Sequence, residues 1–144
     1  MTRTDRTKRI DPVRADSYAE VGRRLLHAGR TMADHGDRQH ASALAILAVH
    51  AVIAYVDAVT IHAGGRKSTS ADHAALGKLL RETLGNRLPD AQGKLIARVV
   101  SEKDQFEYQG YVASWAEASA ILQRAERVGV WVEEVLTTLP RRAS

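Results

Sequence analysis

The chain has 144 residues, enough for one domain with a hydrophobic core, and its many alanine, leucine and valine residues with only three prolines favour helices. It contains no cysteine, which excludes a disulfide framework and a metal site built on thiolates. The formal net charge is +4, and much of the excess lies in the terminal sequences MTRTDRTKR and PRRAS. A basic arm can hold a phosphate backbone, although solvated, disordered tails are the commoner explanation.

Residues 1–15 are predicted to form a disordered basic arm, because they are polar and Pro12 cannot continue an early helix. Ser17 and Glu20 have the spacing of a capping box and predict the start of a first helix, which ends near Gly36. The polar N-terminus lacks the apolar region of a secretory signal, so a cytoplasmic protein is expected.

A second helix is predicted over residues 38–63, ending at Gly64-Gly65, and from Ala41 onward it is almost wholly apolar. Its length raises the possibility of a membrane span. However, it is rich in alanine, and it carries His50 and Asp57 near its middle, where a charge would cost about 2.5–3.5 kcal/mol in a bilayer. A buried core helix, with no membrane contact, is the better interpretation.

The rest of the sequence predicts three more helices and no strand. A polar loop over residues 66–70 leads to a helix that closes at Gly85, the next runs from Pro89 to Gly110, and the last follows a capping box at Ser114 and ends near Leu139. These elements predict an all-α fold, a five-helix antiparallel (up-and-down) bundle around the second helix. Residues 16–139 would form its single domain, and residues 140–144 a basic C-terminal tail.

Two polar residues on the second helix could carry chemistry. His50 and Asp57 are seven apart and share one stripe, but two turns, about 10 Å, separate them, which is too far for a direct hydrogen bond. Each needs a partner on another element if it is buried, and a cation on the fourth helix is a candidate for Asp57. They would be either a satisfied core histidine and a structural ion pair, or the lining of a polar pocket.

The end of the fourth predicted helix holds a second group of polar residues. Lys103 continues the apolar stripe of that helix, and Asp104 and Tyr108 are four apart on a common face. A structural explanation is also open, in which Lys103 pairs with Glu107 and Tyr108 packs with its hydroxyl outward.

The order of the helices, the alanine-rich second helix with embedded polar groups and the charged run that closes the fourth helix resemble the HEPN superfamily over residues 17–139. These are small helical domains of nucleotide- and RNA-associated proteins. The family's ribonucleases carry an arginine, a polar residue and a histidine about five positions after the arginine, and two such helices meet across a homodimer to form a metal-independent active site.

Carried over by position, the resemblance places Lys103 at the arginine, Asp104 at the polar residue and Tyr108 at the histidine, as the catalytic set. It implies that Lys103, His50 and Asp57 bind the phosphate of RNA or a nucleotide. Lysine can contact phosphate, but a tyrosine with a pKa of about 10 is a poor base at neutral pH. The resemblance therefore implies binding, in a toxin–antitoxin or defence system, more than ribonuclease activity.

Other assignments are open. Arg66 and His73 loosely satisfy the arginine–histidine pattern, although they lie in the loop and the first turn of the third helix. No metal or cofactor is expected, because the histidines lack metal-site spacing and the Gly64-Gly65 segment lacks the strand and spacing of a phosphate loop. The alternative to RNA binding is a non-enzymatic dimerisation or docking module, paired with an antitoxin or a nucleotidyltransferase.

Overall fold

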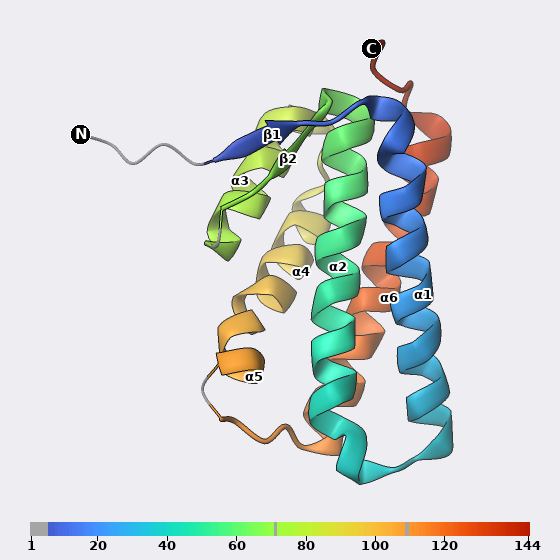
Figure 1. Ribbon diagram of the computed structural model, residues 1–144, viewed down its shortest axis with the longest axis vertical. Helices are drawn as coiled ribbons and strands as arrows, with labels where there is room; N and C mark the ends of the chain where they lie inside the picture. Colours follow the sequence, from blue (N-terminus) through green and yellow to red (C-terminus); the bar gives the residue numbers. More distant parts are fainter. Residues whose placement is uncertain (1–5, 71, 109) are drawn as a thin grey trace, which may run out of the picture.

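The computed structural model describes residues 6–70, 72–108 and 110–144, without the side chains of residues 73, 107 and 108 (Figure 1). The chain is mostly helical, which confirms the predicted class. Its helices are α1 (Ala15–His35), α2 (Ala41–Gly64), α3 (His73–Leu84), α4 (Asp90–Ser101), α5 (Lys103–Tyr108) and α6 (Trp115–Thr138). Short 3₁₀ turns cover Pro12–Arg14, Arg38–His40 and Gly85–Arg87, and two short strands are β1 (Thr7–Arg9) and β2 (Arg66–Ser68).

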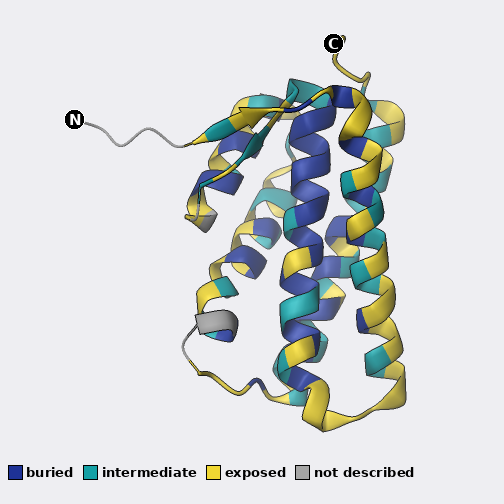
Figure 2. Ribbon diagram, viewed as in Figure 1, coloured by how far each residue is buried: buried dark blue, intermediate teal, exposed yellow. Residues whose placement is uncertain are grey.

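Helix α2 forms the centre of the bundle. It contacts α1 and α6 along one side and α3, α4 and α5 along the other (Figure 1). The stretch Arg38–Gly64 is long and apolar enough to cross a membrane, but 72% of its most apolar window is buried inside the protein. Its C-terminal half is buried almost throughout, whereas exposed positions appear in its N-terminal half (Figure 2). These observations fit a core helix, as the sequence predicts.

The α1, α2 and α6 helices pack closely around Tyr55. This side chain is only 3% exposed, and its ring lies between Gly22 of α1 and Gly129 of α6, where neither neighbour has a side chain to obstruct it. On the outside of this contact, the guanidinium of Arg23 on α1 pairs with the carboxylate of Glu133 on α6 at 3.0 Å. The three long helices therefore pack tightly against one another.

The N-terminal segment differs from the prediction of a disordered arm. Residues 1–5 lie outside the described residues, but β1 pairs antiparallel with β2, and Ile10 is buried next to Ile61 of α2. The backbone N–H of Ile10 also donates to the carbonyl of Gly65 at 2.9 Å. Each strand has only three residues, mostly polar, so neither has an alternating pattern long enough to predict it.

The start of α1 also differs. Asp11 accepts a hydrogen bond from the N–H of Val13 and caps a 3₁₀ turn that runs directly into α1 at Ala15. Pro12 occupies the first position of this turn, where its missing N–H costs nothing. Ser17 is thus inside the helix, and the predicted capping box at its start is wrong. The capping box predicted at Ser114 is confirmed at the start of α6.

Two further differences concern the other side of the bundle. The predicted fourth helix is broken at Glu102 into α4 and α5, and Phe106 of α5 is buried in the core. Strand β2 leads the chain back from the end of α2, so α3 runs in the same sense as α2, and the order of directions is not strictly up-and-down (Figure 1). In an up-and-down bundle the helix after α2 would run in the opposite direction, but here β2 covers the first part of that return.

Candidate functional site

The two polar residues of α2 lie in different surroundings. His50 is exposed, so the interpretation of a core histidine is wrong, whereas Asp57 is only 5% exposed. The difference follows from the covering of α2, whose surface is open in its N-terminal half and closed in its C-terminal half (Figure 2). The shared stripe therefore does not give the two residues a shared environment.

The cation that faces Asp57 comes from β2 and not from the fourth helix. Oδ2 of Asp57 lies 3.6 Å from Nζ of Lys67. Oδ1 of Asp57 is buried without a hydrogen-bond partner among the described residues. Burial raises the pKa of Asp57 to about 6, and the positive charge of Lys67 opposes that rise. The Lys67 ammonium also lies 5.3 Å from the ring centroid of Tyr18 on α1. The ion pair between Asp57 and Lys67 connects α2 with β2.

The proposed catalytic residues lie on α5. Lys103 is half-buried and Asp104 is exposed, while the side chain of Tyr108 lies outside the described residues. Helix α5 contacts α2 and lies beside its N-terminal half, whereas Asp57 is paired with Lys67 in the C-terminal half (Figure 1). The structure therefore separates Asp57 from the group on α5.

The alternative pair is placed in two elements. Arg66 is exposed in β2 and does not lie in an irregular loop. His73 is the first residue of α3, and its side chain is outside the description. The two residues therefore belong to different elements, and Arg66 lies beside Arg9 of β1.

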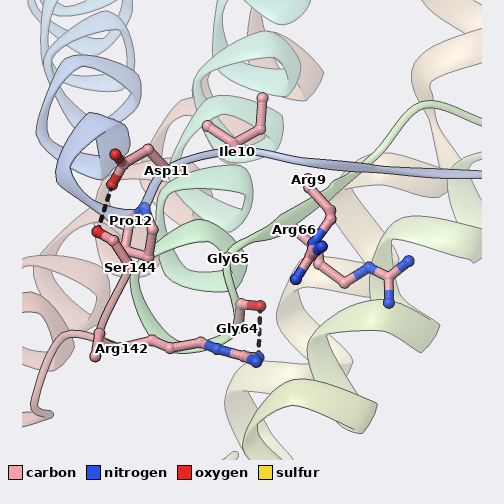
Figure 3. A pocket seen from close by; sticks show the side chains of 10 residues that line it. Arg9, Ile10, Asp11, Pro12, Gly64, Gly65, Arg66, Arg142 and Ser144 are labelled. Carbon is pink, nitrogen blue, oxygen red and sulfur yellow. Dashed lines mark hydrogen bonds between the residues drawn. The ribbon is translucent and has the colours of Figure 1, made fainter.

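A pocket with a volume of about 500 Å³ lies at the C-terminal end of α2. Three arginines line it, Arg9 from β1, Arg66 from β2 and Arg142 from the C-terminal segment, and we call it the arginine pocket. In Figure 3 the side chains of Arg9 and Arg66 lie next to each other, and that of Arg142 reaches along the end of α2 from the other side. The remaining lining residues are Ile10, Asp11, Pro12, Gly64, Gly65, Ala143 and Ser144.

Hydrogen bonds to α2 and to the segment before α1 hold the C-terminal wall of this pocket. The backbone N–H of Arg142 donates to the carbonyl of His62 at 2.8 Å, and its guanidinium donates to the carbonyl of Gly64 at 3.0 Å. The hydroxyl of Ser144 donates to Oδ1 of Asp11 at 3.0 Å. The segment predicted as a basic tail is thus attached to the domain, and Arg142 satisfies carbonyls at the end of α2 that have no partner inside the helix.

The register of the two strands concentrates positive charge. Lys8 lies directly opposite Lys67, and Arg9 lies directly opposite Arg66. Like charges in directly opposed positions destabilise an antiparallel pair. Asp57 compensates Lys67, but among the described residues no carboxylate forms an ion pair with Arg9 or Arg66.

The pocket also contains one side-chain carboxylate, that of Asp11, which the three arginines outnumber. Asp11 accepts hydrogen bonds from the N–H of Val13 and the hydroxyl of Ser144, and these bonds, the backbone one first, lower its pKa. Asp11 therefore stays ionised and offsets one of the three positive charges, which leaves a positive surplus in the lining. Guanidinium groups bind phosphate oxygens through charge-assisted hydrogen bonds, so this surplus can bind an anion.

The sequence contains signals for this site that cannot be combined without the fold. Both basic ends and the pair Arg66-Lys67 are visible in the sequence, but their meeting at one end of the bundle depends on a three-residue strand pairing. Within the described ranges, no three histidine, aspartate or glutamate side chains are grouped as metal ligands.

Comparisons with known proteins add no relative. No family model matches the chain, and neither the curated proteins nor the solved structures contain a significant match. The site must therefore be interpreted from its own chemistry.

Proposed function

We propose that this chain is a HEPN-like helical domain that binds RNA or a nucleotide through the arginine pocket, without cleaving the RNA. The observation that supports this most directly is the opposition of Arg9 and Arg66 across the two-stranded β1–β2 ribbon, beside Arg142. Neither of the two has an acidic partner in the part of the chain that the structure describes. The uncompensated repulsion between these residues would be relieved by a bound phosphate, so the same arrangement that costs stability favours an anion.

The absence of cleavage is proposed from the residues of α5. Ribonucleases of the family that the sequence resembles use a histidine to take a proton near neutral pH, and the α5 sequence Lys-Asp-Gln-Phe-Glu-Tyr contains no histidine. Tyr108 remains a poor base on chemical grounds. The docking alternative has less support, because Trp115 and Trp131, the large aromatic side chains that could anchor a partner, are both partly buried against the core.

The test is the binding of a labelled single-stranded RNA, followed by fluorescence anisotropy over a range of salt concentrations. The double variant Arg9→Ala/Arg66→Ala is expected to bind at least about tenfold more weakly. If the two arginines contact two phosphates, the slope of log K against log salt becomes shallower by about 1.4 in the double variant, since each phosphate contact contributes about −0.7 for a single strand.

A matched control removes the same charge elsewhere. Arg38 and Arg127 are exposed and lie outside the arginine pocket, so Arg38→Ala/Arg127→Ala is expected to reduce binding only slightly. Loss of binding in Lys103→Ala but not in the Arg9/Arg66 variant would move the site to α5. RNA cleavage that persists in EDTA would contradict the non-cleaving assignment, and no salt-dependent binding would contradict the nucleic-acid function and favour the docking module.

A further inference from the structure

The arginine pocket has more features than a generic basic surface. Its charges come from three chain segments that are far apart in sequence, and residues 142–144 form a wall on one side of it. Its volume of about 500 Å³ is within the range of small-ligand sites. A phosphodiester inside a long strand has nucleotides on both sides, so its site must be open in two directions. A phosphate at the end of a strand has a nucleotide on one side only, so its site can have a wall on the other.

The charge of the pocket suits a doubly charged group. A phosphodiester carries one negative charge, and a terminal phosphate carries about −1.5 to −2 at pH 7. Each guanidinium has five N–H donors, and Arg142 uses one of them on the carbonyl of Gly64, which fixes the orientation of the others. Asp11 is the one acidic side chain in the lining, so three arginines and one aspartate leave a surplus of two positive charges, which matches a dianion.

The lining also lacks the groups that recognise a base. The apolar residues in it are Ile10, Pro12 and Ala143, and no aromatic side chain is among the lining residues. Single-stranded nucleic acids are usually held by stacking of bases on aromatic rings, and each stacked base contributes about 1–3 kcal/mol. With no such ring, affinity at this site must come mainly from the phosphate.

We infer that the arginine pocket is a site for a terminal phosphate group, a phosphomonoester dianion at the end of an RNA strand or on a free nucleotide. This inference rests on the proposed function and specifies which phosphate group the pocket binds. Arg9 and Arg66 contact the phosphate from the ribbon side, and Arg142 contacts it from the C-terminal side. The recognition does not depend on the base.

The test compares one RNA oligonucleotide in three forms, with a 5′-phosphate, with a 3′-phosphate and with hydroxyls at both ends. At least one phosphorylated form is expected to bind about tenfold more tightly than the hydroxyl form, and a mononucleotide or inorganic phosphate is expected to compete with it. The preference should be lost in Arg142→Gln, which keeps the backbone bond to His62. The thermal midpoint of that variant shows whether it is folded.

The outcomes separate the two proposals. Equal, arginine-dependent binding of all three oligonucleotides would overturn the terminal-phosphate site and leave the proposed function standing. Binding of phosphate or mononucleotide without binding of any RNA would support the site and overturn RNA as the ligand. If neither RNA nor phosphate binds, both proposals fail. Retention of the full preference in folded Arg142→Gln would remove Arg142 from the site.

Discussion

The variant Asp57→Asn is expected to be more stable than the wild-type chain at pH 7, and the advantage should shrink by about 2–3 kcal/mol as the pH falls to 4. Asp57 is buried, one of its carboxylate oxygens has no hydrogen-bond partner among the residues that the structure describes, and its pKa is raised from 3.8 to about 6. Burial is the main cause of the raised pKa and is only partly offset by Lys67. The folded state therefore favours the neutral carboxyl, which asparagine imitates.

The direction of the pH dependence follows from proton binding. Between pH 3.8 and about 6, Asp57 holds its proton in the folded chain and releases it in the unfolded chain. The stability of the wild type therefore falls as the pH rises through this window and becomes constant above it. Asparagine does not titrate. The difference in unfolding free energy between the two proteins therefore reports the titration of Asp57 alone, because the other acids contribute equally to both.

The measurement is the free energy of unfolding in urea for both proteins, at several pH values between 4 and 8. Asp16→Asn is a suitable control, because Asp16 is exposed on α1 and its side chain forms no ion pair or hydrogen bond within the described part of the chain. A wild-type chain that becomes more stable relative to Asp57→Asn as the pH rises would show that Lys67 outweighs the cost of burial. In that case Asp57 would be an ordinary stabilising ion-pair partner.

Replacing Gly22 by alanine is expected to destabilise the protein by about 1–2 kcal/mol. A Cβ at this position would lie 2.8 Å from Cδ2 and 2.9 Å from Cε2 of Tyr55, closer than such atoms can approach. The ring cannot easily move, because Gly129 of α6 lies on its other side, where a Cβ would be only 3.1 Å from Cε2. Overpacking thus outweighs the gain of about 1 kcal/mol in helix propensity.

Gly77 provides the matched control, because it is also inside a helix but has space around it. A Cβ there would meet only Nη1 of Arg81, at 3.6 Å, so Gly77→Ala is expected to stabilise the chain by about 0.5–1 kcal/mol. Urea midpoints measure both effects. In a Tyr55→Leu background the cost of Gly22→Ala should largely disappear, and a cost that stays the same would show that the Tyr55 ring is not its cause.

The sequence predicts the helices well where one residue pattern is sufficient. The apolar run of α2 and the capping box at Ser114 each act locally, so their outcome can be predicted without a fold. The break at Glu102 and the start of α1 at Ala15 could not be predicted in this way. In the second case a 3₁₀ turn capped by Asp11 extends the helix beyond the capping pattern that the sequence contains.

The site could be predicted only in its parts. The sequence indicates that a buried Asp57 needs a cation, but Lys67 supplies this cation from a strand that has no sequence signal. Arg9 and Arg66 are 57 positions apart and become neighbours only through the register of β1 and β2. The resemblance directs attention to α5 instead, because family patterns locate a site by position in one helix. A site built from chain ends has no such pattern.

The two-stranded β1–β2 ribbon is short, so it is expected to open more easily than the rest of the fold. Two strands of three residues are marginal on their own, and β1 is otherwise fixed mainly by Ile10. This end of the bundle should open locally at a much lower free energy than the core around α2. Amide hydrogens of Ile10 and Thr69, which bond to Gly65 and Arg6, should exchange with solvent quickly in the free protein and more slowly when phosphate is bound. The pocket would then be completed by its ligand, while α2 exchanges at the same rate in both states.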